Sequence, residues 1–450
     1  MKATVVVVNW NGAHLLRPCL DGLARQTMDR NDWQVWVADN DSADDSRAIL
    51  ANEYPWVHVV SNDANLGFAG GNNSALRDVT TPFAVLLNND ATPEPDWLER
   101  LLEPFDSPNA NDLAVTASKI LFMPRFVRLA LSTPGFTPGA HDTRELGIRI
   151  HSVTVNGHEV ADDILWEKLT YGPEGEGEDR YRWTRPAGEL LIPLPVTDAT
   201  LPTPAVVEFS WVSETDKWVR VDWDGGTTTL PVTSDGTQVT LEIPALTPTV
   251  DVINNVGGVV FVEGYGADRG YQQVDGGQFD KPEEVFTACG NGAAIRTAVG
   301  KECGWFDDDF FLYYEDTDLF WRIRSRGHRI MYEPSAVLRH IHSASSGEWS
   351  PTFRFHVDRN RLLMLTKNAT ARLALVQVLR FILTTASMTL RALRTGLAEH
   401  RRPPLRDAVM KVRVFRSYLW LLPRMLIRRR AIRRNARVNR EQLQRWLVAP

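Results

Sequence analysis

The chain has 450 residues and a formal net charge of −6; 43% of its residues are apolar and 24% are charged. This composition is ordinary for a folded soluble protein of two or three domains. Its three cysteines exclude a disulfide framework, and no Cys/His spacing matches a zinc site. From Ala371 onward there are 19 Lys and Arg against 3 Asp and Glu. We therefore expect an acidic body with a basic carboxyl-terminal tail.

Apolar strands alternate with helices in the first quarter of the chain. Continuous apolar runs predict buried strands at residues 4–8, 33–38, 57–60 and 83–87. Helical segments lie between them, and a glycine-rich loop at residues 65–73 opens a further helix. This order predicts βαβ units, and therefore a mostly parallel sheet with right-handed crossovers.

Polar residues follow each of these strands. In chain order they are Asn9 and Asn11, Asp39, Asn65 and Gly67, and Asn88-Asn89-Asp90. Because open α/β sheets bind ligands at the carboxyl edge of their strands, we expect a nucleotide-sized cleft there.

Asp90 has two interpretations. A carboxylate at this edge is a hard oxygen ligand, suited to Mg²⁺ or Mn²⁺ holding a phosphate. The same tripeptide before Thr92-Pro93 is also typical of a helix N-cap or an Asx-turn. With the other polar strand ends beside it, we expect Asp90 to bind a metal ion.

The middle of the chain has an all-β pattern. Alternating apolar and polar residues predict strands at 149–155, 206–211 and 218–223, and Asn156-Gly157 predicts a hairpin turn. We expect an antiparallel β-sandwich-like module at residues 126–250, inserted between a nucleotide-binding half at 1–125 and a catalytic half at 251–368. The module either binds an acceptor glycan or a partner, or is a purely structural addition.

The catalytic half supplies further candidate residues. A small-residue strand at 286–295 contains Gly290 and Asn291, where glycine permits close approach of a ligand. Glu315, Asp316 and Asp318 begin a helix. Carboxylates at such a position either cap the helix or, when aromatic neighbours desolvate them, act as a base near neutral pH.

His340 and Arg359 also have two interpretations each. His340 ends a predicted strand at 336–340, with His342 two residues further on, and is either structural or a metal ligand. Arg359, on a predicted helix at 353–367, either faces solvent or contacts a diphosphate through its guanidinium fork.

Seven features in this order resemble the family 2 glycosyltransferases of the GT-A fold, and within them a rhamnosyltransferase-like branch. They are Val7-Val8-Asn9-Trp10-Asn11-Gly12, Val37-Ala38-Asp39-Asn40-Asp41-Ser42, Asn65-Leu66-Gly67-Phe68-Ala69-Gly70-Gly71-Asn72, Leu87-Asn88-Asn89-Asp90, Cys289-Gly290-Asn291-Gly292, Tyr313 to Arg322, and His340 with Ser345. Each is weak alone, but together they cover roughly residues 1–125 and 250–368.

The resemblance implies an inverting transfer of a sugar from a nucleotide-diphosphate donor, with dTDP-rhamnose favoured, to a hydroxyl of a cell-envelope glycan or lipid-linked acceptor. It implies that Asp316 is the general base, that Asp90 and His340 hold Mg²⁺ or Mn²⁺, and that Asp39 contacts the base of the nucleotide. The remaining substrate-binding residues expected are Asn9, Asn11, Asn65, Gly67, Asn88, Asn89, Gly290, Asn291, Glu315 and Arg359.

Asn88 departs from the pattern, because the family's Asp-x-Asp motif carries an acid there. The change removes one anionic ligand, although this branch commonly has Asn at that position. A non-catalytic scaffold that binds glycans or nucleotide sugars is therefore the alternative function. A glycoside hydrolase using Glu315 is a third, and the strand-end cleft argues against it.

The tail combines apolar stretches at residues 373–393 and 414–427 with arginine clusters. This pattern predicts amphipathic helices on an anionic membrane surface. Nucleic-acid binding would rest on charge alone, so we expect no nucleic-acid partner. Met1-Lys2 leads directly into a strand, and no uncharged apolar stretch reaches 18 residues. We therefore expect no signal peptide, no clear membrane span, and a cytoplasmic protein lying peripherally on the inner face of the plasma membrane.

Overall fold

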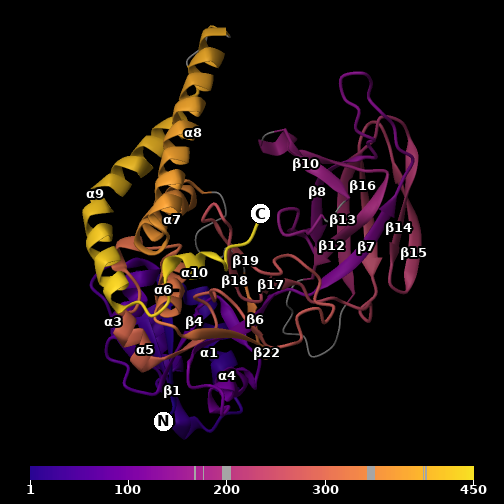
Figure 1. The fold of residues 1–450 in the computed structure, drawn as a ribbon. Coiled ribbons are helices and arrows are strands. Elements are labelled where there is room, and N and C mark those ends of the chain that lie inside the picture. Colours follow the sequence, from indigo (N-terminus) through magenta and orange to yellow (C-terminus); the bar gives the residue numbers. More distant parts are fainter. Residues whose placement is uncertain are drawn as a thin grey trace. The chain divides into compact units, whose positions relative to one another are not determined.

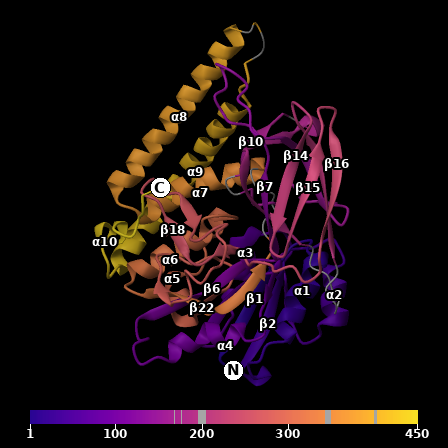
Figure 2. The ribbon, with the colours of Figure 1, turned by 90° about the vertical axis from the view of Figure 1, so that its right-hand side faces the viewer.

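A computed structural model of the protein describes residues 1–166, 169–175, 177–194, 204–341, 350–398, 400 and 403–449 (Figures 1 and 2). The chain forms two compact units. Unit 1 comprises residues 1–121, 253–271 and 277–450, and unit 2 comprises residues 122–252 and 272–276.

Unit 1 is built on a mixed sheet of ten strands. The strands are β1 (Ala3–Asn9), β2 (Trp33–Asp39), β3 (His58–Ser61), β4 (Phe83–Asn88), β5 (Ala91–Pro93), β6 (Leu113–Phe122), β17 (Ile253–Asn255), β20 (Glu283–Glu284), β21 (Ala293–Arg296) and β22 (Arg329–His340). Their order is β20-β22-β6-β21-β4-β1-β2-β3, with β17 beside β6 and β5 beside β22. The β3, β2, β1 and β4 strands are parallel, as the sequence predicted, whereas β21 runs antiparallel to both β4 and β6. A small separate sheet pairs β18 (Gly258–Val260) with β19 (Gly266–Asp268).

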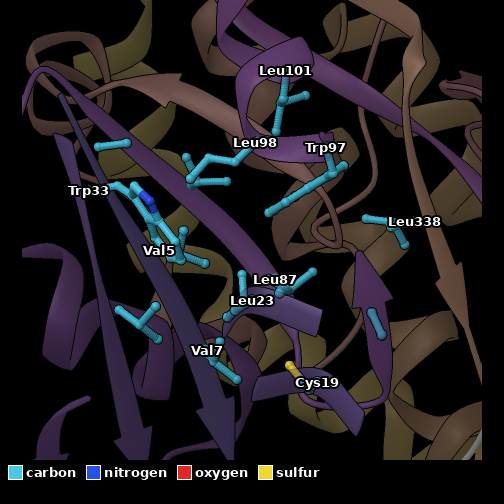
Figure 3. Close-up of a cluster of buried hydrophobic side chains, with 14 of the residues drawn as sticks. Val5, Val7, Cys19, Leu23, Trp33, Leu87, Trp97, Leu98, Leu101 and Leu338 are labelled. Atoms are coloured by element: carbon cyan, nitrogen blue, oxygen red, sulfur yellow. The ribbon is translucent and has the colours of Figure 1, made fainter. Parts of the chain in front are cut away.

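Helices cover both faces of this sheet. They are α1 (Ala13–Ala24), α2 (Ser46–Glu53), α3 (Gly67–Leu76), α4 (Trp97–Leu102), α5 (Thr297–Cys303) and α6 (Glu315–Ser325). Successive residues of a strand point to opposite faces. Accordingly, Val5 and Val7 pack with Cys19, Leu23 and the helices α1, α2 and α4 (Figure 3). Val6 packs on the other face, in a cluster that includes side chains of α3, α5 and α6.

The tail is helical and belongs to unit 1. Its elements are α8 (Ala371–Ala398), α9 (Arg406–Asn435) and α10 (Arg440–Gln444), which follow α7 (Pro351–Asn368). Leu362 of α7, Phe381 of α8, Tyr418 of α9 and Leu443 of α10 share one buried cluster. Among the described residues, α8 alone is long and apolar enough to cross a membrane, a criterion of length and composition only.

Unit 2 is an antiparallel sandwich. Its strands are β7 (Phe126–Ser132), β8 (Arg149–Val155), β9 (His158–Glu159), β10 (Thr170–Glu174), β11 (Tyr181–Thr184), β12 (Ala187–Pro193), β13 (Ala205–Val212), β14 (Lys217–Trp223), β15 (Gly226–Val232) and β16 (Thr237–Ile243). One sheet has the order β10-β11-β8-β13-β16, with β9 on β8, and the other has the order β12-β7-β14-β15. Leu129 and Val221 of one sheet share a core with Val153 and Phe209 of the other. The expected hairpin joins β8 to β9, and Asn156 has a positive φ of 51°, as a primed turn requires.

Two expected strands differ from the structure. The expected strand at 286–295 is ordered as a strand only from Ala293, because Gly292 before it has a φ of 75°, which an extended strand cannot accommodate. The expected strand at 336–340 is the end of a longer one, since β22 begins at Arg329 and passes through Pro334. Pro334 lies between the residues of β22 that pair with β20 and those that pair with β5, so neither of these two pairings needs its missing N–H.

Candidate active site

Three neighbouring parallel strands of unit 1 end in polar residues at the same edge of the sheet. Asn9 of β1 is in register with Asp39 of β2, and Asn88 of β4 is in register with Val8 of β1. The parallel pairing therefore places the three polar residues at adjacent positions.

Asn9 connects these strand ends and is fully buried. Its Nδ2 donates to Asp39 Oδ2 at 3.3 Å and to Ser42 Oγ at 3.2 Å, while its Oδ1 accepts from Asn89 Nδ2 at 2.9 Å. The chain passes so close that a Cβ atom at Gly12 would lie 2.3 Å from Asn89 Nδ2. A side chain at position 12 would therefore displace the Asn89 amide from Asn9.

Asp39 is a buried carboxylate surrounded by donors. Its Oδ1 accepts from Arg47 Nε at 2.7 Å and from the Ser42 N–H at 3.1 Å. Burial raises the pKa of Asp39, but hydrogen bonds from Ser42, Arg47 and Asn9 outweigh it and hold that pKa below its ordinary value. Asp39 is therefore an ionised acceptor at neutral pH.

The other predicted nucleotide-binding residues shape loops. The Oδ1 of Asn11 accepts from the Ala43 N–H at 2.8 Å, and the Oδ1 of Asn65 accepts from the Gly67 N–H at 2.9 Å. Gly67 has a φ of 70°, and a Cβ atom there would lie 2.5 Å from the carbonyl oxygen of Phe311. The glycine-rich loop therefore packs directly on the segment that precedes the acidic helix α6.

Asp90 and His340 lie together although they are far apart in sequence. Pairing of β5 with β22 places His340 opposite Ala91, and His340 Nε2 lies 3.1 Å from Asp90 Oδ1. The Nδ1 of His340 lies 3.1 Å from Asn254 Oδ1. His342 and Ser345, which the sequence also singled out, lie outside the described residues.

These residues fit a divalent cation. Asn88 Oδ1, two positions before Asp90, is buried and accepts no hydrogen bond from the described part of the chain. A carboxylate, an amide oxygen and an imidazole suit Mn²⁺ or Mg²⁺. No cluster of three or more His, Cys, Asp and Glu side chains occurs among the described residues. Phosphate oxygens and water would therefore complete the coordination, as is usual for Mg²⁺.

The Cys289-Gly290-Asn291-Gly292 loop connects the two halves of the site. Asn291 Oδ1 accepts from the Asn88 N–H at 3.1 Å. The Gly290 N–H donates to Asp316 Oδ2 at 3.1 Å. A Cβ atom at Gly290 would lie 3.2 Å from the ring of Phe68, which is tight, and 3.5 Å from Asp316 Cβ, which is an ordinary contact.

Asp316 lies in the first turn of α6. Its Oδ1 also accepts from Thr317, from the N–H at 2.5 Å and from Oγ1 at 3.2 Å. Burial and, to a lesser extent, the charge of Asp268 raise the pKa of Asp316 above its ordinary value, although hydrogen bonds from Thr317 and Gly290 offset part of this. A carboxylate with a raised pKa is a stronger base once it is ionised.

The neighbouring acids have different environments. Burial, followed by the charge of Asp316, raises the pKa of Glu315 well above its ordinary value, and its Oε2 has no hydrogen-bond partner in the described chain. Asp318 is fully buried and accepts from Lys367 at 2.8 Å and from Arg322 at 2.9 Å. Asp318 is therefore part of an ion-pair cluster rather than of the site edge.

The segment before α6 has an unusual backbone that α7 holds in place. Phe311, Tyr313 and Tyr314 have positive φ values of 65°, 68° and 68°. The Nδ2 of Asn360 donates to the carbonyl oxygens of residues 310, 312 and 313 at 2.9, 2.8 and 2.8 Å. Asn360 is fully buried. Sequence reasoning missed this residue; its position beside Arg359 was the only signal.

Arg359 is also buried, and its donors face the protein. Its Nη2 lies 2.9 Å from the carbonyl oxygen of Phe310 and 3.1 Å from that of Asp309, and its Nε donates to Asn360 Oδ1 at 2.8 Å. Burial lowers its pKa. The solvated helix face considered for Arg359 is wrong, because its side chain is 8% exposed. The diphosphate contact stays a prediction.

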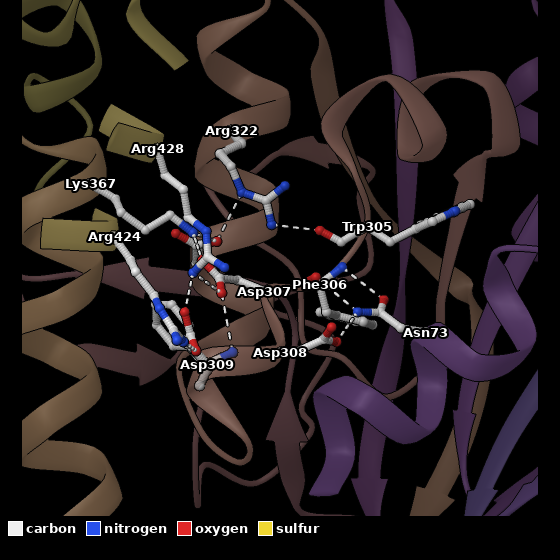
Figure 4. A network of polar contacts seen from close by, with 12 residues as sticks. Asn73, Trp305, Phe306, Asp307, Asp308, Asp309, Arg322, Lys367, Arg424 and Arg428 are labelled. Carbon is white, nitrogen blue, oxygen red and sulfur yellow. Dashed lines mark hydrogen bonds and ion pairs between the residues drawn. The ribbon is translucent and has the colours of Figure 1, made fainter. Parts of the chain in front are cut away.

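An ion-pair network ties the tail to the same segment (Figure 4). Arg428 of α9 lies 2.5 Å from carboxylate oxygens of both Asp307 and Asp309, and Arg424 pairs with Asp309 at 3.0 Å. Lys367 of α7 pairs with Asp307 and Asp318. The tail thus contributes to the position of the loop that leads into Asp316.

Residues 4–164 match a family model described as Glycosyl transferase family 2. The chain is 25% identical over 100 residues to glycosyltransferase AglE of Haloferax volcanii, which covers 22% of this chain and 33% of that protein. It is 28% identical over 126 residues to a poly(ribitol-phosphate) beta-glucosyltransferase of Bacillus spizizenii, which covers 27% of this chain and 19% of that protein. The matched stretches therefore span a third or less of these relatives.

Three solved structures resemble the chain at low identity. GalNAc-T7 with UDP, GalNAc and Mn²⁺ is 12% identical with a TM-score of 0.45, and the match covers 82% of this chain and 48% of that one. The mannosyltransferase PcManGT of Pyrobaculum calidifontis with GDP-Man and Mn²⁺ is 14% identical with a TM-score of 0.40, and the match covers 94% of this chain and 87% of that one. S. aureus TarS 1–349 is 12% identical with a TM-score of 0.41, and the match covers 99% of this chain and 90% of that one. None of these matches names a rhamnosyltransferase, so that branch stays a prediction. Residues 4–164 are therefore similar to glycosyltransferase family 2, and the parallel β3-β2-β1-β4 sheet with its antiparallel β21 strand fits the GT-A fold expected from the sequence.

Proposed function

We propose that the protein is an inverting glycosyltransferase that moves a hexose, with rhamnose favoured, from a nucleotide-diphosphate donor to a hydroxyl of a cell-envelope glycan or lipid-linked acceptor. One observation carries this proposal. The Cys289-Gly290-Asn291-Gly292 loop joins Asn88, beside the Asp90–His340 pair, to the buried carboxylate Asp316. A diphosphate site and a base are thereby connected through hydrogen bonds of a single loop.

In the proposed reaction, the acceptor oxygen forms a bond to the anomeric carbon while the bond from that carbon to the diphosphate breaks. The acceptor proton goes to the carboxylate of Asp316, and the bonding electrons leave with the diphosphate. Asp39 accepts a hydrogen bond from the base of the nucleotide, and Asn9 keeps Asp39 in place. Asp90, His340 and Asn88 Oδ1 would hold a divalent cation, which when bound would neutralise the charge of the leaving diphosphate. Asn11, Asn65, Gly67 and Asn89 shape the nucleotide pocket, Arg359 contacts the diphosphate, and Glu315 binds substrate beside Asp316.

The acceptor class and the location are part of the proposal. The matched relative from Bacillus spizizenii is named for transfer to poly(ribitol-phosphate), which supports an envelope polymer as acceptor. The basic tail supports a cytoplasmic enzyme lying on the inner face of the plasma membrane. The inserted sandwich is proposed to contact the acceptor glycan.

The test is release of nucleoside diphosphate from a panel of nucleotide sugars, with Mg²⁺, with Mn²⁺ and with a chelator. We expect Asp316→Asn and Asp90→Ala to lose activity, by roughly a hundredfold or more, since each removes a group that acts in the transition state. Asp63→Asn, an exposed loop acid, is the control. Full activity in both site variants would reject the assignment.

A non-catalytic scaffold is the second candidate, and Asn88 in place of an acid favours it. Calorimetry that shows nucleotide-sugar binding, together with no turnover for any acceptor, would support the scaffold.

A further inference from the structure

The α8 helix exposes an apolar stripe. Leu375, Leu379, Leu383, Leu390 and Leu397 are 60%, 50%, 67%, 56% and 76% exposed. Their spacing of four and seven residues places them on one side of the helix. Leu373 and Phe381 on the opposite side are buried in unit 1. The exposed stripe is thus a second apolar face, separate from the one that packs in the fold.

The α9 helix has the same two-sided character. Val414, Tyr418, Leu421 and Met425 are buried. The opposite side exposes Val409, Val412, Leu419, Trp420, Leu426 and Ile427, and Trp420 is 71% exposed. A large aromatic ring in water is unfavourable unless a partner covers it, because its burial removes apolar area from water.

Two pairs of arginines in α9 have different environments. Arg424 and Arg428 are paired with Asp307 and Asp309 (Figure 4). Arg413 and Arg416 are exposed among the apolar residues, and neither pairs with an acid in the described chain. Arg424 and Arg428 therefore stabilise the fold through ion pairs, whereas Arg413 and Arg416 are exposed cations without an acidic partner in the described chain.

Arg413 and Arg416 line two grooves. One of about 450 Å³ is lined by Thr389 of α8 and by residues of α9 that include Val409, Val412 and both arginines. Another of about 680 Å³ is lined by Phe355, Ser417, Trp420 and the same arginines. The two helices lie side by side (Figures 1 and 2). Thr389 of α8 therefore lies beside the two cationic residues of α9.

We infer that this surface, comprising Leu379, Leu383, Leu390, Arg413, Arg416 and Trp420, docks on an anionic phospholipid bilayer, with a lipid phosphate held between Arg413 and Arg416. Arginine matches phosphate through its two-pronged fork. Leucines reach the acyl boundary, and tryptophan is favoured at the level of the headgroups. The inference deepens the proposed function, because it assigns residues and a lipid chemistry to the membrane partner proposed there.

The contacts of α8 favour a helix that lies on the membrane over one that spans it. Phe381 stacks on Phe415 of α9 with ring centroids 6.3 Å apart. Gln377 Oε1 accepts from Arg361 Nη1 of α7 at 3.4 Å. A spanning α8 would have to leave both partners and carry Arg380 into the hydrocarbon, which is costly. A nucleic-acid partner would leave the leucine stripe in water.

The test is co-sedimentation of the full chain with phosphatidylcholine vesicles, with and without phosphatidylglycerol. We expect binding to the anionic vesicles that weakens with salt. The double variant Arg413→Gln/Arg416→Gln should lose roughly fivefold in partitioning per charge removed. The matched control Arg25→Gln/Lys281→Gln removes two exposed charges elsewhere in unit 1 and should bind like the parent. Inorganic phosphate at the same concentration as the lipid should not compete.

An apolar pair completes the design. Trp420→Ser should weaken vesicle binding, whereas Trp218→Ser, which removes a ring that is 60% exposed in unit 2, should not. Three results would overturn the inference. They are equal binding to neutral and anionic vesicles, retention on the vesicles after an alkaline carbonate wash, and binding of the double arginine variant at the level of the parent. Nucleoside diphosphate release is measured in parallel with a soluble acceptor. If the parent protein binds vesicles but releases no nucleoside diphosphate, the proposed enzymatic function is rejected. If it releases nucleoside diphosphate but does not bind vesicles, the docking surface is rejected.

Discussion

The Nε2 atom of His340 lies 3.1 Å from Oδ1 of Asp90. On its other side, His340 Nδ1 lies 3.1 Å from Asn254 Oδ1. An amide oxygen accepts but does not donate, so with a cation on the Asp90 side this contact would favour the tautomer with the proton on Nδ1. The Nε2 lone pair is then directed to the Asp90 side, where a cation would be bound. Asn254 would therefore orient His340 as the proposed metal ligand.

The first prediction concerns this orienting contact. Asn254→Leu should raise the Mn²⁺ concentration needed for half-maximal nucleoside diphosphate release by roughly tenfold to a hundredfold, because the loss of such an outer partner weakens metal binding by that amount. The measurement is a Mn²⁺ titration of the release rate. Asn109→Leu, at an exposed position of unit 1, is the control. An unchanged Mn²⁺ requirement would show that Asn254 does not act on the site.

The second prediction concerns the pH dependence of Asp316. A base must be ionised to act, so activity falls as pH falls through the pKa of Asp316. Because that pKa is raised, the acid limb should lie above the value of about 3.9 for an ordinary aspartate. Thr317→Val removes the 3.2 Å hydrogen bond from Oγ1 that stabilises the carboxylate. The limb should then move up by roughly half a unit to one unit.

The profile of kcat/KM against pH measures this limb. Thr317→Ser keeps the hydroxyl and should retain the parental profile. If Thr317→Val left the limb in place, or moved it to lower pH, Asp316 would not be the titrating base.

Local patterns in the sequence were sufficient to predict the sheet edge. The strands β1, β2 and β4 are continuous apolar runs, and parallel pairing brings Asn9, Asp39 and Asn88 to one edge in register. The inserted sandwich was predictable for the same reason, because alternating residues such as those of β13 and β14 are a local signal.

Contacts between distant segments were not predictable in this way. Asp316 and Asp318 are equivalent in the sequence, but residues two apart point to different sides of a helix. Asp316 meets Gly290, whereas Asp318 meets Lys367 of α7. The role of Asn360 depends on a loop about fifty residues earlier whose positive φ values no local pattern indicates. The network of Arg428 likewise depends on how the tail folds back.

The third prediction concerns Glu315 and stability. Because its pKa is raised in the folded state, the folded protein holds a proton there that the unfolded chain releases above about pH 4.3. The contribution of Glu315 to the free energy of unfolding is therefore lost as the pH rises through its raised pKa. Glu315→Gln keeps the shape without the ionisable group, so it should melt at a higher temperature than the parent at neutral and alkaline pH.

Thermal unfolding followed by circular dichroism at several pH values tests this expectation. The two proteins should converge at acidic pH, where Glu315 is protonated in both states. The opposite result would be a Glu315→Gln variant that melts below the parent at alkaline pH but not at acidic pH. It would mean that the carboxylate is ionised and paired in the folded protein.

The last prediction concerns Asn360, the buried amide that holds the segment before Asp316. Asn360→Leu would leave the carbonyl oxygens of residues 310, 312 and 313 without this donor inside the protein. We expect a loss of at least roughly 2 kcal/mol in the free energy of unfolding, since an unsatisfied buried polar group costs about that much. Asn52→Leu, at an exposed position of α2, should have little effect. Because this loop leads into Asp316, the proposed base, and not into the nucleotide pocket, kcat should fall in Asn360→Leu while the KM for the donor stays near the parental value. Denaturant unfolding and steady-state kinetics at a temperature where the variant remains folded separate the two effects. A rise in the donor KM with an unchanged kcat would instead place the influence of Asn360 on the glycine-rich loop around Gly67, which packs on the same segment.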